Sequence, residues 1–99
     1  MINLFSTEKV NNKEEVFESL LELPNIQIEK ITSNGQSSST WYQSEKDEWV
    51  VLLEGEGKLL FEDGKELTLK KGEHLHIPKM QRHKVTYTAS PTIWLAIHF

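Results

Sequence analysis

Glu48 and His83 are the two residues of this chain whose types could do chemistry together. In an apolar setting, desolvation raises the pKa of a carboxyl group, whereas a protonated imidazole beside it favours the carboxylate form. A pair balanced in this way can transfer protons near neutral pH. Glu48 precedes the apolar segment 49–54, and His83 lies near the start of the segment 82–88. We predict that both are catalytic residues, provided that the fold brings them into one pocket.

The same two residues are candidate ligands of a divalent metal ion. A metal that keeps an open position for a substrate needs about three protein ligands, and borderline ions accept imidazole and carboxylate together. Gln43 offers an amide oxygen, and His98 offers a second imidazole. The predicted ligand set is Gln43, Glu48, His83 and His98. Such a set does not distinguish between zinc, iron, manganese and nickel. The alternative to a metal site is a pocket that holds no metal.

Aromatic side chains are candidates for the walls of the pocket. The predicted ligand-binding residues are Trp41, Tyr42, Tyr87 and Trp94. An aromatic face at the mouth of a barrel suits a flat or apolar ligand. We therefore expect a small organic molecule as the partner of this pocket.

Composition excludes several other kinds of site and partner. The chain has 99 residues and no cysteine, so disulfides, thiolate ligands and a thiol nucleophile are excluded. A net charge of −4 offers no broad basic surface, so nucleic acid is not an expected partner. No apolar run approaches the ~20 residues that span a bilayer, and the first residues lack the pattern of a secretory signal. We expect no membrane partner and a cytoplasmic location.

One short helix is expected over residues 12–23. Asn12 is suited to cap its first turn, and Glu15 follows three residues later, a pairing typical of helix starts. The apolar stripe of this helix would be Val16, Phe17, Leu20 and Leu21. Pro24 would end it, because proline disfavours the helical conformation in the preceding residue.

Residues 26–99 are expected to form short β-strands. The first would lie around Ile26, Ile28 and Ile31, and the others would span 49–54, 58–62, 65–69, 74–78, 82–88 and 92–99. Gly55-Glu56-Gly57 and Asp63-Gly64 predict tight hairpin turns between neighbouring strands. Many short strands with one early helix predict an antiparallel sandwich or barrel, in a single domain over residues 1–99.

Strand alternation gives a direction to some of the candidate residues. His83 shares a strand face with Val85, and we expect it to point inward. Glu48 and His98 lie on segments that are apolar on both faces, so alternation leaves their directions open.

Two spaced segments resemble the paired motifs of the cupin superfamily, which consists of small β-barrels that hold metal ligands in their interior. In the first segment, Gly35 is followed by QSSST, then by Trp41-Tyr42-Gln43, SEKD, Glu48, WVVLLE and Gly55. The family has His-x-His where this chain has Trp-Tyr-Gln. In the second segment, Gly72, Pro78 and His83 match the family, whereas Met80 replaces a glycine and Tyr87 replaces an asparagine.

The resemblance covers residues 35–99 and implies an antiparallel, jelly-roll-like cupin barrel. It also implies ligand roles for Glu48 and His83, with Trp41 and Gln43 in the positions of the missing histidines. Two functions stay open: a metal-dependent enzyme of unknown reaction that acts on a small molecule, and a non-catalytic small-molecule-binding cupin that has lost its metal site. A homodimer, an arrangement common among cupins, is also expected.

Overall fold

The computed structural model describes residues 3–7 and 13–99. Its regular elements are all strands: β1 (Val16–Leu23), β2 (Ile26–Ser33), β3 (Glu48–Glu54), β4 (Glu56–Phe61), β5 (Glu66–Lys70), β6 (His74–Ile77), β7 (His83–Thr88) and β8 (Thr92–His98). The described ranges therefore hold no helix of the length and apolar character needed to cross a membrane.

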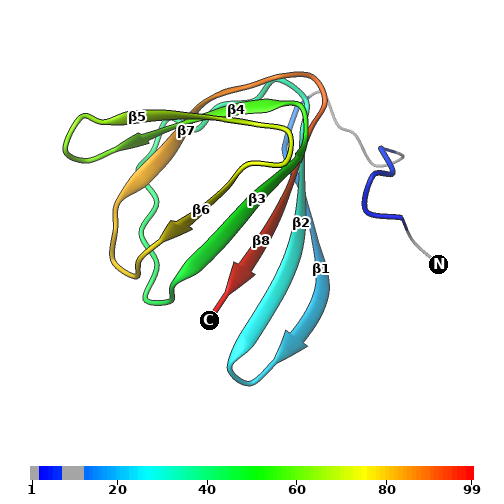
Figure 1. Cartoon of the computed structure of the whole chain (residues 1–99), viewed down its shortest axis with the longest axis horizontal. Helices are drawn as coiled ribbons and strands as arrows, with labels where there is room; N and C mark the ends of the chain where they lie inside the picture. The colour runs from blue at the N-terminus through cyan, green and yellow to red at the C-terminus, as the bar shows by residue number, and fades with distance from the viewer. Residues whose placement is uncertain (1–2, 8–12) are drawn as a thin grey trace.

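The strands form two antiparallel sheets (Figure 1). The larger sheet has the order β1-β2-β8-β3-β6, and the smaller sheet has the order β5-β4-β7. The last strand, β8, lies between β2 and β3, so the end of the chain is in the middle of the larger sheet. The prediction of an all-β architecture for residues 26–99 is confirmed.

One hydrophobic core joins the two sheets. The larger sheet contributes Val50, Leu52, Ile77 and Trp94 to this core, and the smaller sheet contributes Leu59, Phe61 and Leu69. Gly57 on β4 approaches Trp94 so closely that a Cβ atom there would lie 2.2 Å from Cζ2 of the indole. Because only a residue without a Cβ fits at this place, β4 can lie directly against the indole.

The predicted helix over residues 12–23 is wrong, because residues 16–23 form the edge strand β1. This strand pairs with β2, for example Phe17 with Ile31 and Leu23 with Ile26. A register shift between Ser19 and Leu21 interrupts the alternation of side chains, so the apolar residues are spaced as on a helix. An isolated helix of this length is marginal in water, whereas pairing with a strand already in the sheet satisfies the backbone. The predicted cap, Asn12, lies outside the described residues.

Candidate functional site

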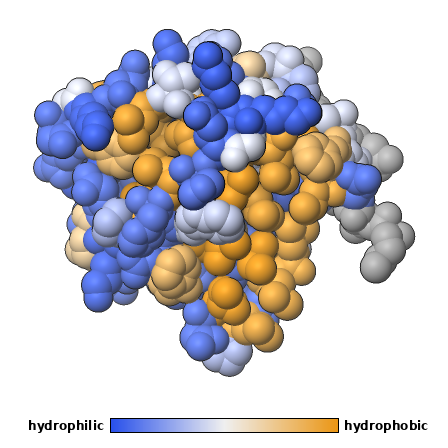
Figure 2. Space-filling model, viewed as in Figure 1, coloured by the Kyte–Doolittle hydropathy of each residue, from blue (hydrophilic) through white to orange (hydrophobic). Residues whose placement is uncertain are grey.

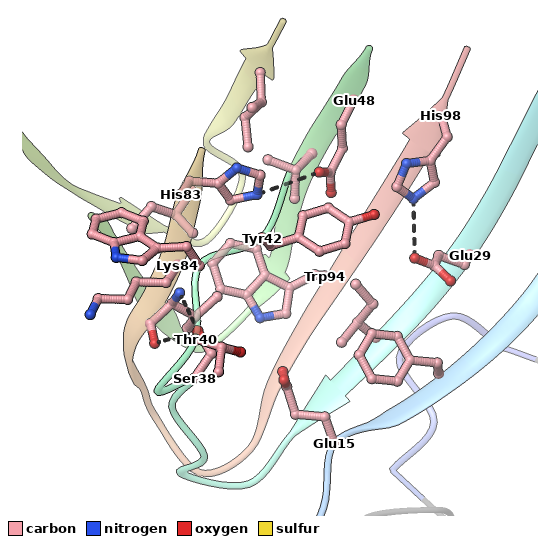
Figure 3. A pocket seen from close by; sticks show the side chains of 17 residues that line it. Glu15, Glu29, Ser38, Thr40, Tyr42, Glu48, His83, Lys84, Trp94 and His98 are labelled. Carbon is pink, nitrogen blue, oxygen red and sulfur yellow. Dashed lines mark hydrogen bonds and ion pairs between the residues drawn. The ribbon is translucent and has the colours of Figure 1, made fainter. Parts of the chain in front are cut away.

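A cavity of about 300 Å³ opens between the two sheets, at the end where β3 and β7 begin (Figure 3). Its apolar walls include Val50 and Trp94 from the larger sheet and Leu59 and Val85 from the smaller one. Its polar side chains include Glu48, His83 and His98. A mostly apolar cavity with a few convergent polar groups is typical of small-molecule sites.

Glu48 is the first residue of β3 and faces the cavity. It lies on the same side of the strand as the buried residues Val50 and Leu52, and it is only 9% exposed. Its Oε1 atom lies 3.8 Å from Nε2 of His83, which is 7% exposed. The fold therefore brings the carboxyl group and the imidazole into one pocket, at a distance that allows an ion pair but is too long for a direct hydrogen bond.

The ring of His83 is held in place from two sides. Its Nδ1 atom lies 3.0 Å from the carbonyl oxygen of Gln81, and a carbonyl can only accept, so Nδ1 carries a proton. The ring also meets Tyr42 edge-on, with centroids 5.4 Å apart, and the backbones of these two residues form an isolated β-bridge. This arrangement leaves Nε2 as the ring atom that faces Glu48.

His98 also faces the cavity, because it shares the inward side of β8 with Trp94 and Ala96. Its Nε2 atom lies 3.1 Å from Oε1 of Glu29, a residue on the neighbouring strand β2. Glu48 is the cross-strand partner of His98 on the other side. His98 therefore lies between two carboxyl groups and bonds to one of them (Figure 3).

The surroundings shift the pKa values of two of these groups. Burial raises the pKa of Glu48, and the positive charges that His98 and His83 can carry oppose this rise only in part. The hydrogen bond to Glu29 raises the pKa of His98, against the opposing effect of burial. Glu48 consequently keeps its proton to a higher pH than an ordinary glutamic acid, and His98 keeps its charge to a higher pH than an ordinary histidine.

Comparison with protein families gives a match over most of the barrel. A family model described as the cupin domain matches residues 30–98. The chain is a cupin. None of the curated proteins compared with this cupin matches it.

Solved structures give the same fold. A candidate mannose-6-phosphate isomerase from Ralstonia eutropha JMP134 is 40% identical, with a TM-score of 0.91 and coverage of 99% of this cupin and 95% of that chain. A cupin superfamily protein from Desulfitobacterium hafniense DCB-2 is 19% identical, with a TM-score of 0.80 and coverage of 90% and 80%. An RmlC-like cupin family protein with a double-stranded β-helix fold, from Methanocaldococcus jannaschii, is also 19% identical, with a TM-score of 0.75 and coverage of 87% and 80%. The last two support the fold alone.

Two of the predicted site residues lie away from the cavity of this cupin. Gln43 is exposed, and its amide nitrogen lies 3.9 Å from Sδ of Met80. Because residues 41–43 form a single bridge rather than a strand, alternation does not carry Gln43 to the side of Trp41. Tyr87 is 43% exposed on the outside of β7, because a register shift between β4 and β7 breaks the alternation that starts at His83.

The side chains of this cupin do not fit the predicted four-residue metal site. Among residues 3–7 and 13–99, no three His, Asp or Glu side chains are grouped so as to hold one metal ion. Glu48 and His83 supply one pair, the imidazole of His98 is engaged by Glu29, and Gln43 points elsewhere. An amide is also a weaker ligand than the imidazole that it would replace.

Three predicted aromatic residues, Trp41, Tyr42 and Trp94, do line the cavity. Two carboxyl groups that were not predicted, those of Glu15 and Glu29, also line the cavity. The predicted place of Glu15 in a helix start is wrong, because Glu15 precedes β1 and accepts a hydrogen bond from the hydroxyl group of Ser33. Glu29 could have been found from its alternation with Ile31 on β2, once that side of the strand was known to face inward.

Proposed function

We propose that this cupin binds a small organic molecule in the cavity between its sheets, and that Glu48 and His83 exchange a proton with the bound molecule. The observation that carries the proposal is the buried approach of these two groups, 3.8 Å apart and facing the same cavity. The separation leaves both groups able to bond to a third group rather than to each other.

The proton exchange follows from the states of the two side chains. Burial raises the pKa of Glu48, so this carboxyl group can donate a proton at a pH where an exposed one has lost it. His83 donates from Nδ1 to the carbonyl oxygen of Gln81 and presents Nε2 to the cavity, so Nε2 is the ring atom at which a proton can be exchanged with the ligand. A ligand that reaches both groups can receive a proton from one and release a proton to the other.

Isomerisation is the reaction class that fits this pair. Moving a carbonyl group along a carbon chain requires one proton to be taken and another to be returned, which an acid and a base on the same molecule can do. The name of the Ralstonia relative, a candidate mannose-6-phosphate isomerase, supports this class. A phosphate group on the substrate is less well supported, because the only Lys or Arg among the described lining residues is Lys84.

The alternative is a binding protein without catalysis, and the replacement of the family's first-motif histidines by Trp41 and Gln43 favours it. Neither proton exchange nor binding without catalysis requires a resident metal ion. The described side chains that line the cavity agree with this, because they do not supply a complete set of metal ligands. Metal analysis of protein purified without a histidine tag tests this point. We expect less than one metal ion per chain, and stoichiometric metal would favour the metal-dependent enzyme instead.

The proposal is tested by screening small molecules for binding to the wild-type chain and to Glu48→Gln and His83→Gln. Molecules that occupy the cavity should bind the wild type and lose affinity by about tenfold, or about 1.4 kcal/mol, in both variants. Glu45→Gln and His74→Gln are the matched controls, because neither residue lines the cavity. Equal binding to all five proteins would overturn the proposal. Exchange of ligand protons for deuterium in D₂O would then separate an enzyme from a binding protein.

A further inference from the structure

Carboxyl groups dominate the charge of the cavity. Its described lining includes Glu15, Glu29 and Glu48, against one lysine, Lys84, and two histidines, His83 and His98. Glu29 is engaged by His98 at 3.1 Å, whereas Glu15 accepts from the hydroxyl group of Ser33 and Glu48 has His83 at 3.8 Å. Glu15 and Glu48 therefore retain oxygen lone pairs for a ligand that donates hydrogen bonds.

The one lysine is held away from these carboxyl groups. Nζ of Lys84 lies 4.7 Å from the ring centroid of Trp41, within the range of a cation–π contact. Figure 3 shows the side chain of Lys84 pointing away from Glu15 and Glu48. An anionic group beside Glu48 would therefore meet a carboxyl group without a cation from this lysine.

Aromatic rings complete the site around the carboxyl groups. The indole of Trp94 is buried in the cavity wall, and the rings of Tyr42 and Phe17 also line the cavity and are more exposed. Aromatic faces and carboxyl groups both attract an ammonium group, and the rings also cover flat apolar surface. The cavity, at about 300 Å³, is at the small end of the range for ligand sites, so it suits one ring with a short side chain.

We infer that the ligand of this cavity is a small organic cation, in which an ammonium group is carried on a flat apolar body. The inference rests on the proposed function, since it names the class of molecule that the cavity binds. The ammonium group donates hydrogen bonds to Glu48, whose ionised form it favours, while the apolar body lies against Trp94.

A series of three probes of nearly equal size tests the inference: 2-phenylethylamine, 2-phenylethanol and phenylacetate, which are cationic, neutral and anionic at neutral pH. Binding of each to the full chain is measured by calorimetry and by ligand-observed NMR. We expect the amine to bind at least about tenfold more tightly than the alcohol, and phenylacetate not to bind. Glu48→Gln should weaken the amine by more than it weakens the alcohol, so the tenfold preference for the amine should be lost.

The order of the three affinities in the wild type tests the inference even if Glu48→Gln does not fold, and Glu45→Gln, at an exposed position, is the control. An alcohol or an acid that binds as tightly as the amine overturns the inference, as does failure of all three probes to bind. If the alcohol binds as tightly as the amine and both depend on Glu48 and His83, the ligand class is wrong while the proposed pocket function stands. If the amine binds equally to the wild type and to Glu48→Gln, the site itself is wrong.

Discussion

The carboxyl group of Glu48 has a higher affinity for its proton in the folded chain than in the unfolded chain, because burial raises its pKa above the ordinary value of 4.5. A carboxyl group whose pKa is higher in the folded chain than in the unfolded chain stabilises the fold most at pH values below its pKa in the unfolded chain. That contribution is lost as the pH rises through the folded pKa, where the buried group ionises. The site therefore lowers the stability of the fold at neutral pH.

Replacing Glu48 by glutamine should raise the Tm at pH 7, because the amide has a similar shape and cannot ionise. The gain should shrink as the pH falls and should vanish below 4.5, where the wild-type carboxyl group is protonated in both states. Calorimetry across this pH range measures it, with about 4–8 °C in Tm for each kcal/mol in a domain of this size. Glu45→Gln, at an exposed position, should show no such gain. A Glu48→Gln chain that is less stable than the wild type at pH 7 would contradict the account.

At the residue scale, motif spacing predicted which side chains meet and missed how they are paired. The positions of Glu48 and His83 in the two motifs predicted a shared pocket, and the structure brings them to 3.8 Å. The bond between His98 and Glu29 could not be predicted, because it depends on β8 lying next to β2. Strand order of this kind is set by contacts distant in sequence and leaves no local pattern.

At the scale of elements, β1 shows the limits of prediction from side-chain spacing, and β4 shows how the cavity wall is packed. The apolar residues of β1 follow a helical spacing, yet Phe17 is 60% exposed and Leu21 is 43% exposed. An edge strand with a bulge does not need one buried side, so alternation fails as a guide there. The strands from β2 onward were predictable because glycine and proline turns separate short apolar runs in that part of the chain.

Gly57 on β4 allows a prediction about how the cavity wall is held. Gly57→Ala places a methyl group against the Trp94 indole, where a Cβ atom would lie 2.2 Å from Cζ2. Overpacking of this kind costs about 1–3 kcal/mol, and we expect an unfolding free energy lower by that amount together with a changed indole NMR signal. Gly35→Ala is the comparison, because nothing lies within 4 Å of a Cβ at that position, although its φ of +87° carries some strain. If Gly57→Ala is as stable as the wild type, Trp94 does not lie against β4.

At the scale of the whole molecule, the outer side of the larger sheet is notable for its apolar residues. The strand registers place Leu21, Ile28, Ile97 and Trp49 in one row across four strands. Figure 2 shows a broad hydrophobic area over this part of the molecule. Contiguous apolar patches on monomers rarely exceed a few hundred Å², and larger ones mark interaction surfaces.

We expect a second copy of this chain on that outer side, because a two-fold axis through the centre of the row packs each apolar residue against the same row of its partner. The charged groups beside the row are engaged, since Nζ of Lys30 donates to the carbonyl oxygen of Ser6 and Nε2 of His76 lies 3.0 Å from Oδ1 of Asp47. Light scattering should give twice the chain mass of 11.5 kDa, and Ile97→Lys should give the chain mass itself. Tyr87→Lys, on the smaller sheet, should leave the dimer intact. A wild-type chain that is monomeric at all concentrations would contradict the prediction.

The most direct test of the central claim, that Glu48 and His83 share one buried pocket, is a pH titration of the Glu48 side-chain carboxyl carbon by NMR in the wild type and in His83→Gln. We predict a pKa above 4.5 in the wild type, and a further rise in the variant, because the charge on His83 lowers the pKa of Glu48. A carboxyl group that titrates at its ordinary value, and does so equally in both proteins, would contradict the claim.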